Sequence, residues 1–128
     1  MNFHCGSDAY GGGGGDHMSC YGRGNAIVYG GYGEDHIVTL DGNDIINAGP
    51  GMDDVNAGGG NDEVYIYNEC ELEPGEQMAG GAGYDVLFVP FGMTVNDLDV
   101  MGIVYTGFEE IIALEDDERG YSECLWQL

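Results

Sequence analysis

A nine-residue repeat constrains the fold of this chain more than any other feature. From Tyr21 to Tyr65 the sequence divides into five consecutive nonapeptides, and a sixth begins at Gly80. In order they are YGRGNAIVY, GGYGEDHIV, TLDGNDIIN, AGPGMDDVN, AGGGNDEVY and GGAGYDVLF. A unit this short cannot bury an apolar face alone, so successive units must stack on one another. The repeat therefore predicts a solenoid.

Three positions of the repeat keep their residue type. The fourth position is glycine in every copy, and the sixth is aspartate except in the first copy, where Ala26 stands. The eighth position is always aliphatic: Val28, Ile37, Ile46, Val55, Val64 and Leu87. A single apolar residue between freer neighbours is typical of a short, half-buried strand. We therefore expect strands at positions 7 to 9 and turns between them.

The turn residues favour a calcium site. Glycines at positions 1, 2 and 4 permit positive φ, which lets a tight backbone aim its carbonyl oxygens at one point. The aspartate at position 6 adds a charged, hard oxygen ligand. Calcium takes about six to eight oxygen ligands with tolerant geometry, and this suits a flexible, carbonyl-rich turn better than magnesium or zinc coordination would.

The same pattern resembles the RTX, or hemolysin-type, repeat G-G-x-G-x-D-x-U-x over Tyr21 to Phe88. The resemblance implies that each Ca²⁺ lies between adjacent turns of one edge, held by aspartate side chains and loop carbonyls. Ala26 and Leu40 depart from the motif, so their turns should bind more weakly. The candidate metal-binding residues are Asp35, Asp44, Asp53, Asp62, Asp85, Gly31, Gly33, Gly42, Gly49, Gly51, Gly58, Gly60, Gly81 and Gly83.

Stacking rules turn this repeat into a fold. Alternate turns lie on opposite edges, so each coil of the solenoid takes two consecutive nonapeptides. The prediction is an all-β fold, a parallel β-roll or two-edged solenoid. Turns that are two nonapeptides apart share an edge, so Asp35 should pair with Asp53, and Asp44 with Asp62.

The fifth and sixth repeats begin 23 residues apart, which is one coil and five extra residues. We therefore expect an enlarged turn at 68–79, followed by a short strand, and we expect Asp85 to pair with Asp62 on one edge. These pairs predict about three calcium ions. Because Asp62 serves two pairs, Asp62→Ala should weaken calcium binding most, and more than Asp35→Ala.

The ends of the chain are less regular. Residues 1–20 are a glycine-rich leader, in which GGGGDHMSC from Gly12 fits the repeat register with Gly15 at position 4 and His17 replacing aspartate. This is either a degenerate capping turn or a flexible glycine linker. Residues 21–88 are the roll. Residues 89–128 contain two β-rich runs, MGIVYTG and FEEIIAL, and are predicted to be a C-terminal capping segment of strands.

Charge and composition exclude several classes of function. Asp plus Glu number 24 against two basic residues, a net charge of −22, which disfavours nucleic acid and anionic lipid as partners. The hydrophobic content of 43% is too high for a purely solvating disordered chain. No apolar run is long enough to span a membrane, and the first residues lack the pattern of a secretory signal.

The cysteines leave alternatives open. Cys5, Cys20, Cys70 and Cys124 are compatible with two disulfides, but the sequence does not assign their pairing. A zinc site built from His4, Cys5, His17 and Cys20 has plausible ligand types but irregular spacing. Surface histidines and disulfide cysteines are the simpler interpretation.

The sequence favours a binding module over an enzyme, because its aspartates are explained by metal and no catalytic motif occurs. Two hypotheses remain. In the first, calcium triggers folding of a secreted or cell-surface module. In the second, calcium is a constant scaffold, and exposed tyrosines recognise a protein or polysaccharide partner: Tyr32, Tyr65, Tyr67 and Tyr84.

Overall fold

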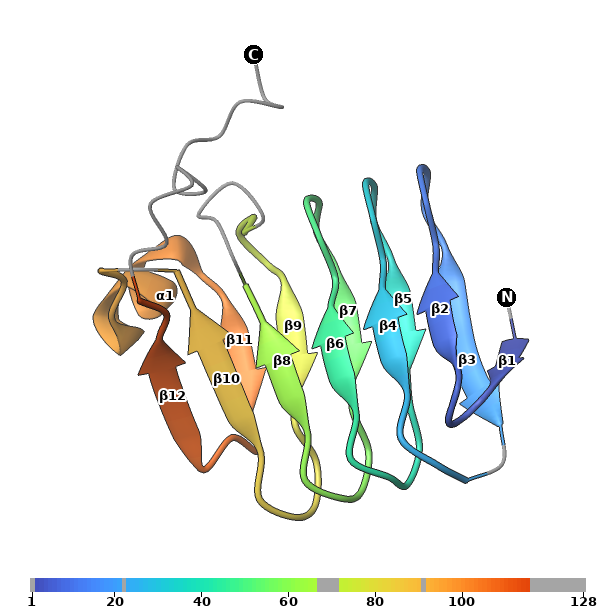
Figure 1. Ribbon diagram of the computed structural model, residues 1–128. Coiled ribbons are helices and arrows are strands. Elements are labelled where there is room, and N and C mark those ends of the chain that lie inside the picture. The colour runs from blue at the N-terminus through green and yellow to red at the C-terminus, as the bar shows by residue number, and fades with distance from the viewer. Residues whose placement is uncertain (1, 22, 67–71, 91, 116–128) are drawn as a thin grey trace.

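The computed structural model describes residues 2–21, 23–66, 72–90 and 92–115. Two six-stranded sheets face each other, and every strand pair is parallel (Figure 1). The odd-numbered strands form one sheet and the even-numbered strands the other. The strands are β1 (Asn2–His4), β2 (Asp8–Tyr10), β3 (His17–Tyr21), β4 (Ile27–Tyr29), β5 (His36–Val38), β6 (Ile45–Asn47), β7 (Asp54–Asn56), β8 (Glu63–Tyr65), β9 (Gln77–Ala79), β10 (Val86–Val89), β11 (Val104–Thr106) and β12 (Glu110–Ala113). This confirms the predicted parallel β-roll.

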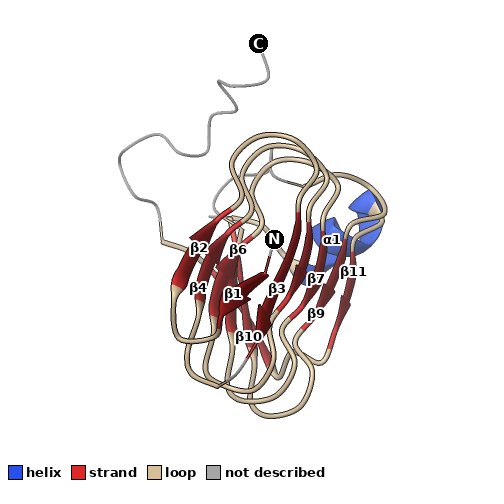
Figure 2. Cartoon of the chain, turned by 90° about the vertical axis from the view of Figure 1, so that its right-hand side faces the viewer, coloured by secondary structure: helices blue, strands red, loops and turns tan. Residues whose placement is uncertain are grey.

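The strands of the central repeats occupy positions 7 to 9 of the nonapeptide, as predicted. Ile27 of β4 pairs with Ile45 of β6, and His36 of β5 with Asp54 of β7, so each coil takes two nonapeptides. The chain passes from one sheet to the other at each turn, which places successive turns on opposite edges, as Figure 2 shows from the N-terminal end. All six aliphatic residues at position 8 are buried between the sheets. One apolar layer therefore runs the length of the roll.

The 23-residue spacing also has the predicted cause. Asp54 of β7 pairs with Gln77 of β9, and Glu63 of β8 pairs with Val86 of β10. Both pairs are 23 residues apart in the sequence, five more than the usual 18. The connection between β8 and β9 is common to both intervals, so the five extra residues lie there. Strand β9 occupies the last three residues of 68–79, the range that the sequence predicts as the enlarged turn.

The register predicted for the segment after Gly12 is wrong by one residue. His17 pairs with His36 and Met18 with Ile37, so Met18 stands at position 8 and is fully buried. The repeat unit is GGGGGDHMS from Gly11, with Asp16 at position 6. A one-residue slip sends every side chain to the opposite face, and the expected register would have placed Ser19 in the core instead of Met18.

The C-terminal segment contains a helix that the sequence analysis did not predict. Helix α1 (Val95–Met101) lies between β10 and β11 and replaces a turn (Figure 1). Thr94 and Asp97 form a capping box at its start, and Gly102 ends it in the left-handed conformation. Beyond α1, β11 and β12 extend the two sheets by one strand each, so this segment continues the roll.

A disulfide joins Cys5 and Cys20, whose Cα atoms lie 4.9 Å apart. It ties the connection after β1 to the neighbouring strand β3. Both sulfurs are committed to this bond, so the zinc alternative with His4 and His17 does not hold. Cys70 and Cys124 lie outside the described residues. Within the described part of the chain, no helix has the length and apolar character to span a membrane.

Candidate metal centre

The turns of the roll form two separate edges. Turns 11–16, 30–35 and 48–53 connect the even sheet to the odd sheet and make up the first edge. Turns 39–44, 57–62 and 80–85 run in the opposite direction and make up the second edge. Each turn ends at position 6 of the repeat, immediately before a strand. The parallel pairing of the strands therefore stacks the position-6 residues directly above one another.

The structure brings together the aspartates in the three pairs that the sequence predicts. The backbone N–H of Asp35 donates to Oδ1 of Asp53 across 2.8 Å on the first edge. On the second edge, the N–H of Asp44 donates to Oδ1 of Asp62, and the N–H of Asp62 donates to Oδ1 of Asp85, both across 2.8 Å. All five side chains are buried. Each edge thus carries a ladder of buried carboxylates.

The ladders are longer than the sequence analysis predicted. On the first edge, the N–H of Asp16 donates to Oδ1 of Asp35 across 2.9 Å. On the second edge, the N–H of Asp85 donates to Oε1 of Glu109 across 2.6 Å. Five consecutive glycines precede Asp16, so position 4 of the repeat is glycine in either of two registers, and the glycines alone do not identify the correct one. Glu109 lies outside the nonapeptide array, and only the strand register reveals its position.

In Asp35, Asp44, Asp62 and Asp85, Oδ1 accepts a hydrogen bond from the backbone of a neighbouring turn. Oδ2 is buried without a hydrogen-bond partner in Asp16, Asp35, Asp44, Asp62 and Asp85. Buried polar atoms in proteins are nearly always paired, so a repeated exception requires an explanation. A cation would satisfy these oxygens.

Backbone carbonyls converge on the same spaces. A methyl group placed on Gly30 would lie 2.8 Å from Oδ2 of Asp35 and 2.5 Å from the carbonyl oxygen of Ala48 in the next turn. The equivalent position on Gly80 lies 3.0 Å from Oδ2 of Asp85. A carboxylate from one turn and a carbonyl from its neighbour therefore face a shared space. Such an oxygen donor set fits calcium.

The predicted glycines make this close stacking possible. All nine have positive φ, between 78° and 128°. A Cβ on Gly60 would lie only 2.0 Å from the carbonyl oxygen of Gly42 in the neighbouring turn. Any side chain there would push the two turns apart. Leu40 replaces a glycine at position 2 and projects outward, with 45% of its surface exposed.

Burial changes the acidity of the ladder. Desolvation raises the pKa of Asp35 from 3.8 to about 6 and the pKa of Asp62 to about 8, and nearby carboxylates add to both shifts. Desolvation likewise raises the pKa of Asp44 and the pKa of Asp85. The metal-free ladder therefore resists ionisation, and a bound cation would reverse this preference.

The sites depend on carbonyl oxygens as well as on side chains. Among the described residues, no group of three or more His, Cys, Asp or Glu side chains is arranged to hold one metal ion. An ion between two turns would instead meet one or two carboxylates and several backbone oxygens. Calcium, with its high coordination number and flexible geometry, accepts this arrangement more readily than zinc.

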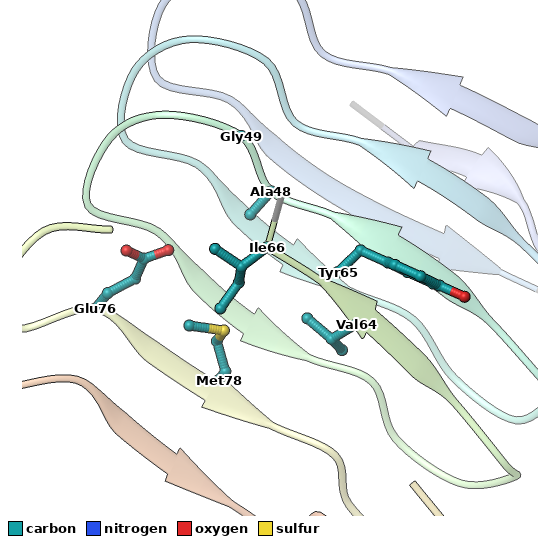
Figure 3. A pocket seen from close by; sticks show the side chains of 7 residues that line it. All are labelled: Ala48, Gly49, Val64, Tyr65, Ile66, Glu76 and Met78. Atoms are coloured by element: carbon teal, nitrogen blue, oxygen red, sulfur yellow. The ribbon is translucent and has the colours of Figure 1, made fainter. Parts of the chain in front are cut away.

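Glu76 occupies position 6 of the enlarged turn, where the repeat has aspartate. It lies directly before β9, is only 2% exposed, and its carbonyl accepts a hydrogen bond from the N–H of Val104. Figure 3 shows its carboxylate near Ile66, in a cavity of about 10 Å³. This volume holds at most one water molecule. The repeat motif does not identify Glu76, because Leu72 and Pro74 stand where the motif has glycine at positions 2 and 4.

Three of the tyrosines considered as a partner surface lie in different parts of the described roll. Tyr32 lies in a first-edge turn and Tyr84 in a second-edge turn, where its hydroxyl contacts Glu110. Tyr65 is on β8 and stacks on Phe88, with ring centroids 4.4 Å apart. Tyr67 lies outside the described residues.

The comparison with known proteins agrees with this geometry. Residues 29–64 match the family model of the RTX calcium-binding nonapeptide repeat, in four copies. No curated protein and no solved structure matches the chain. The matched residues include the stacked turns that carry Asp35, Asp44, Asp53 and Asp62. Residues 29–64 of this chain therefore form an array of RTX repeats, which indicates that it binds calcium.

Proposed function

We propose that the chain binds about three Ca²⁺ ions between stacked turns and that these ions drive its folding. The observation that carries this proposal is the set of buried Oδ2 atoms that lack hydrogen bonds and recur on both edges. Each of these oxygens lies in a turn whose neighbour on the same edge contributes another carboxylate. Calcium would satisfy the carboxylates and the carbonyls together.

The proposed sites follow the carboxylate pairs. One ion lies between Asp35 and Asp53, one between Asp44 and Asp62, and one between Asp62 and Asp85, together with carbonyls of the glycine-rich turns. The corrected register offers a further position between Asp16 and Asp35. Asp35 and Asp62 then each lie between two carboxylates. The two residues should matter equally, which replaces the expectation that Asp62 matters more.

Electrostatics support the coupling to folding. The chain carries a net charge of −22 and only two basic residues, so compact packing of its carboxylates is self-repulsive. Three divalent ions would neutralise about six of these charges at the points where carboxylates crowd most closely. Because metal sites of this kind exist only in the folded chain, binding free energy becomes folding free energy.

This coupling suits a secreted or cell-surface protein. Extracellular calcium modules have dissociation constants of about 10⁻⁴ to 10⁻³ M, far above resting cytosolic calcium. The chain would be unfolded at low calcium and would fold where calcium is abundant. In the alternative function, calcium is a permanent scaffold for partner recognition. In that case the chain would keep most of its β structure when calcium is removed.

Isothermal titration calorimetry tests the proposed sites. Wild-type protein should bind three ions, or four where the position between Asp16 and Asp35 is also filled, and Asp62→Asn should lose the two ions that share this carboxylate. Asp41→Asn is the matched control, because Asp41 lies in a turn of the same edge but is exposed. Unchanged stoichiometry in Asp62→Asn, or an equal loss in Asp41→Asn, would refute the proposed sites.

A further inference from the structure

A second kind of metal ligand is concentrated on the outer face of the odd sheet. His17, His36 and Asp54 occupy the first position of β3, β5 and β7, and the parallel register places them side by side. The imidazole rings of His17 and His36 have centroids 4.7 Å apart and are tilted by 49°. Both side chains are exposed to solvent. Two imidazoles are thus held next to each other by the backbone of the roll.

Asp54 orients one of these rings. Nδ1 of His36 lies 3.3 Å from Oδ2 of Asp54. Donation of the Nδ1 proton to this carboxylate leaves Nε2 of neutral His36 with the lone pair, directed away from Asp54. Histidines that bind metals in proteins usually donate their other ring N–H to a carboxylate or carbonyl in this way. The arrangement prepares His36 to act as a ligand.

We propose that His17 and His36 form a site for Zn²⁺ or a similar divalent transition metal, separate from the calcium sites, with Asp54 as the positioning residue. Two nitrogens bound to one zinc at about 2.0 to 2.1 Å lie roughly 3.3 Å apart, which adjacent rings on neighbouring strands can reach. Water completes the coordination. The described part of the chain has no group of three His, Cys, Asp or Glu side chains arranged to hold one metal ion.

Ligand chemistry keeps the two kinds of site distinct. Imidazole nitrogen suits zinc, copper and nickel, whereas the oxygen donors of the turns suit calcium. The net charge of −22 raises the local concentration of any divalent cation near the roll. A site with only two protein ligands should bind zinc with a dissociation constant on the order of micromolar, well short of a structural zinc site.

Calorimetric titration with ZnCl₂ tests this site in full-length protein held at 10 mM Ca²⁺, so that calcium occupies the carboxylate turns and the roll is folded. His17→Gln and His36→Gln should each weaken zinc binding by about tenfold or more, and Asp54→Asn by several-fold. His4→Gln is the matched control, because His4 lies on β1 of the same sheet, packs against Tyr21 and should not affect zinc binding. Circular dichroism should show the same β signal for all four variants.

Imidazole ¹H–¹⁵N spectra give a second readout. Zinc should shift the ring resonances of His17 and His36 but not those of His4, and Asp54→Asn should change the tautomer balance of His36 before zinc is added. Zinc affinity that is unchanged in both His17→Gln and His36→Gln would overturn the proposal. So would an equal loss in His4→Gln, which would indicate unspecific binding to histidines.

Discussion

Adjacent isoleucines on β6 provide the sharpest test of how folding and calcium are linked. Ile46 is fully buried between the sheets, whereas Ile45 points outward and is 38% exposed. Both have the same size and the same local backbone. Ile46→Ala and Ile45→Ala therefore differ in the face from which the side chain is removed.

The structure gives the expected magnitudes. Ile46→Ala removes buried carbon and leaves a cavity in a single-residue apolar layer, at a cost of about 3 kcal/mol. Ile45→Ala removes a side chain that is partly in water, at a cost of about 1 kcal/mol. If about three ions bind in one transition with folding, the lost folding free energy is divided among the three binding events. A tenfold rise in the calcium midpoint then requires a loss of about 1.4 kcal/mol for each ion. The calcium midpoint should therefore rise about fivefold in Ile46→Ala and less than twofold in Ile45→Ala.

Calcium titrations followed by far-UV circular dichroism measure both midpoints. Equal shifts in the two variants would show that β6 is not oriented as described. A destabilised Ile46→Ala protein with an unchanged calcium midpoint would refute the linkage itself, because folding and binding would then be independent.

Three further predictions follow from the ladder and the N-terminal end. Asp53→Asn should raise the calcium midpoint several-fold and Asp54→Asn should leave it unchanged, because Asp53 is buried in the ladder and Asp54 is half exposed on the outer face; equal effects would contradict the ladder. Burial raises the pKa of Asp62 from 3.8 to about 8 in the calcium-free roll, so the stability from its protonation is full below about pH 4 and is lost as the pH rises through 8. In EGTA any residual far-UV β signal should therefore be larger at pH 5 than at pH 8, and calcium should reverse this order; a larger signal at pH 8 without calcium would exclude the raised pKa. Replacing both Cys5 and Cys20 by serine removes a crosslink over a 15-residue separation, and should lower the free energy of unfolding by about 3 kcal/mol in denaturant titrations at saturating calcium; an unchanged value would show that the disulfide does not stabilise the N-terminal coil.

Most of the roll could be predicted because its rules are local and repeat. Glycine at position 4, aspartate at position 6 and an aliphatic residue at position 8 together determine the turn, the strand and its inward face. The length of two nonapeptides per coil then determines which turns share an edge. The same counting placed Asp85 next to Asp62 across the five-residue insertion, since an insertion in one turn leaves the strand pairing intact.

The ends of the array escaped prediction for a different reason. Five consecutive glycines before Asp16 fit more than one register, and the need to bury Met18 decided between them. Glu76 and Glu109 reach the ladder positions through strand pairing and not through the motif. Helix α1 begins at the capping box of Thr94 and Asp97. The helix has only seven residues, which is too short to show a clear helical periodicity in the sequence.

The central claim is that calcium holds the two carboxylate ladders together and thereby folds the chain. Far-UV circular dichroism of the full chain in EGTA, and then with Ca²⁺ raised to 10 mM, tests it directly, with Mg²⁺ at the same concentrations as the control. We expect a cooperative transition from coil to β structure with Ca²⁺ and none with Mg²⁺. A β signal that is already complete in EGTA, or one that Mg²⁺ produces equally well, would contradict the claim.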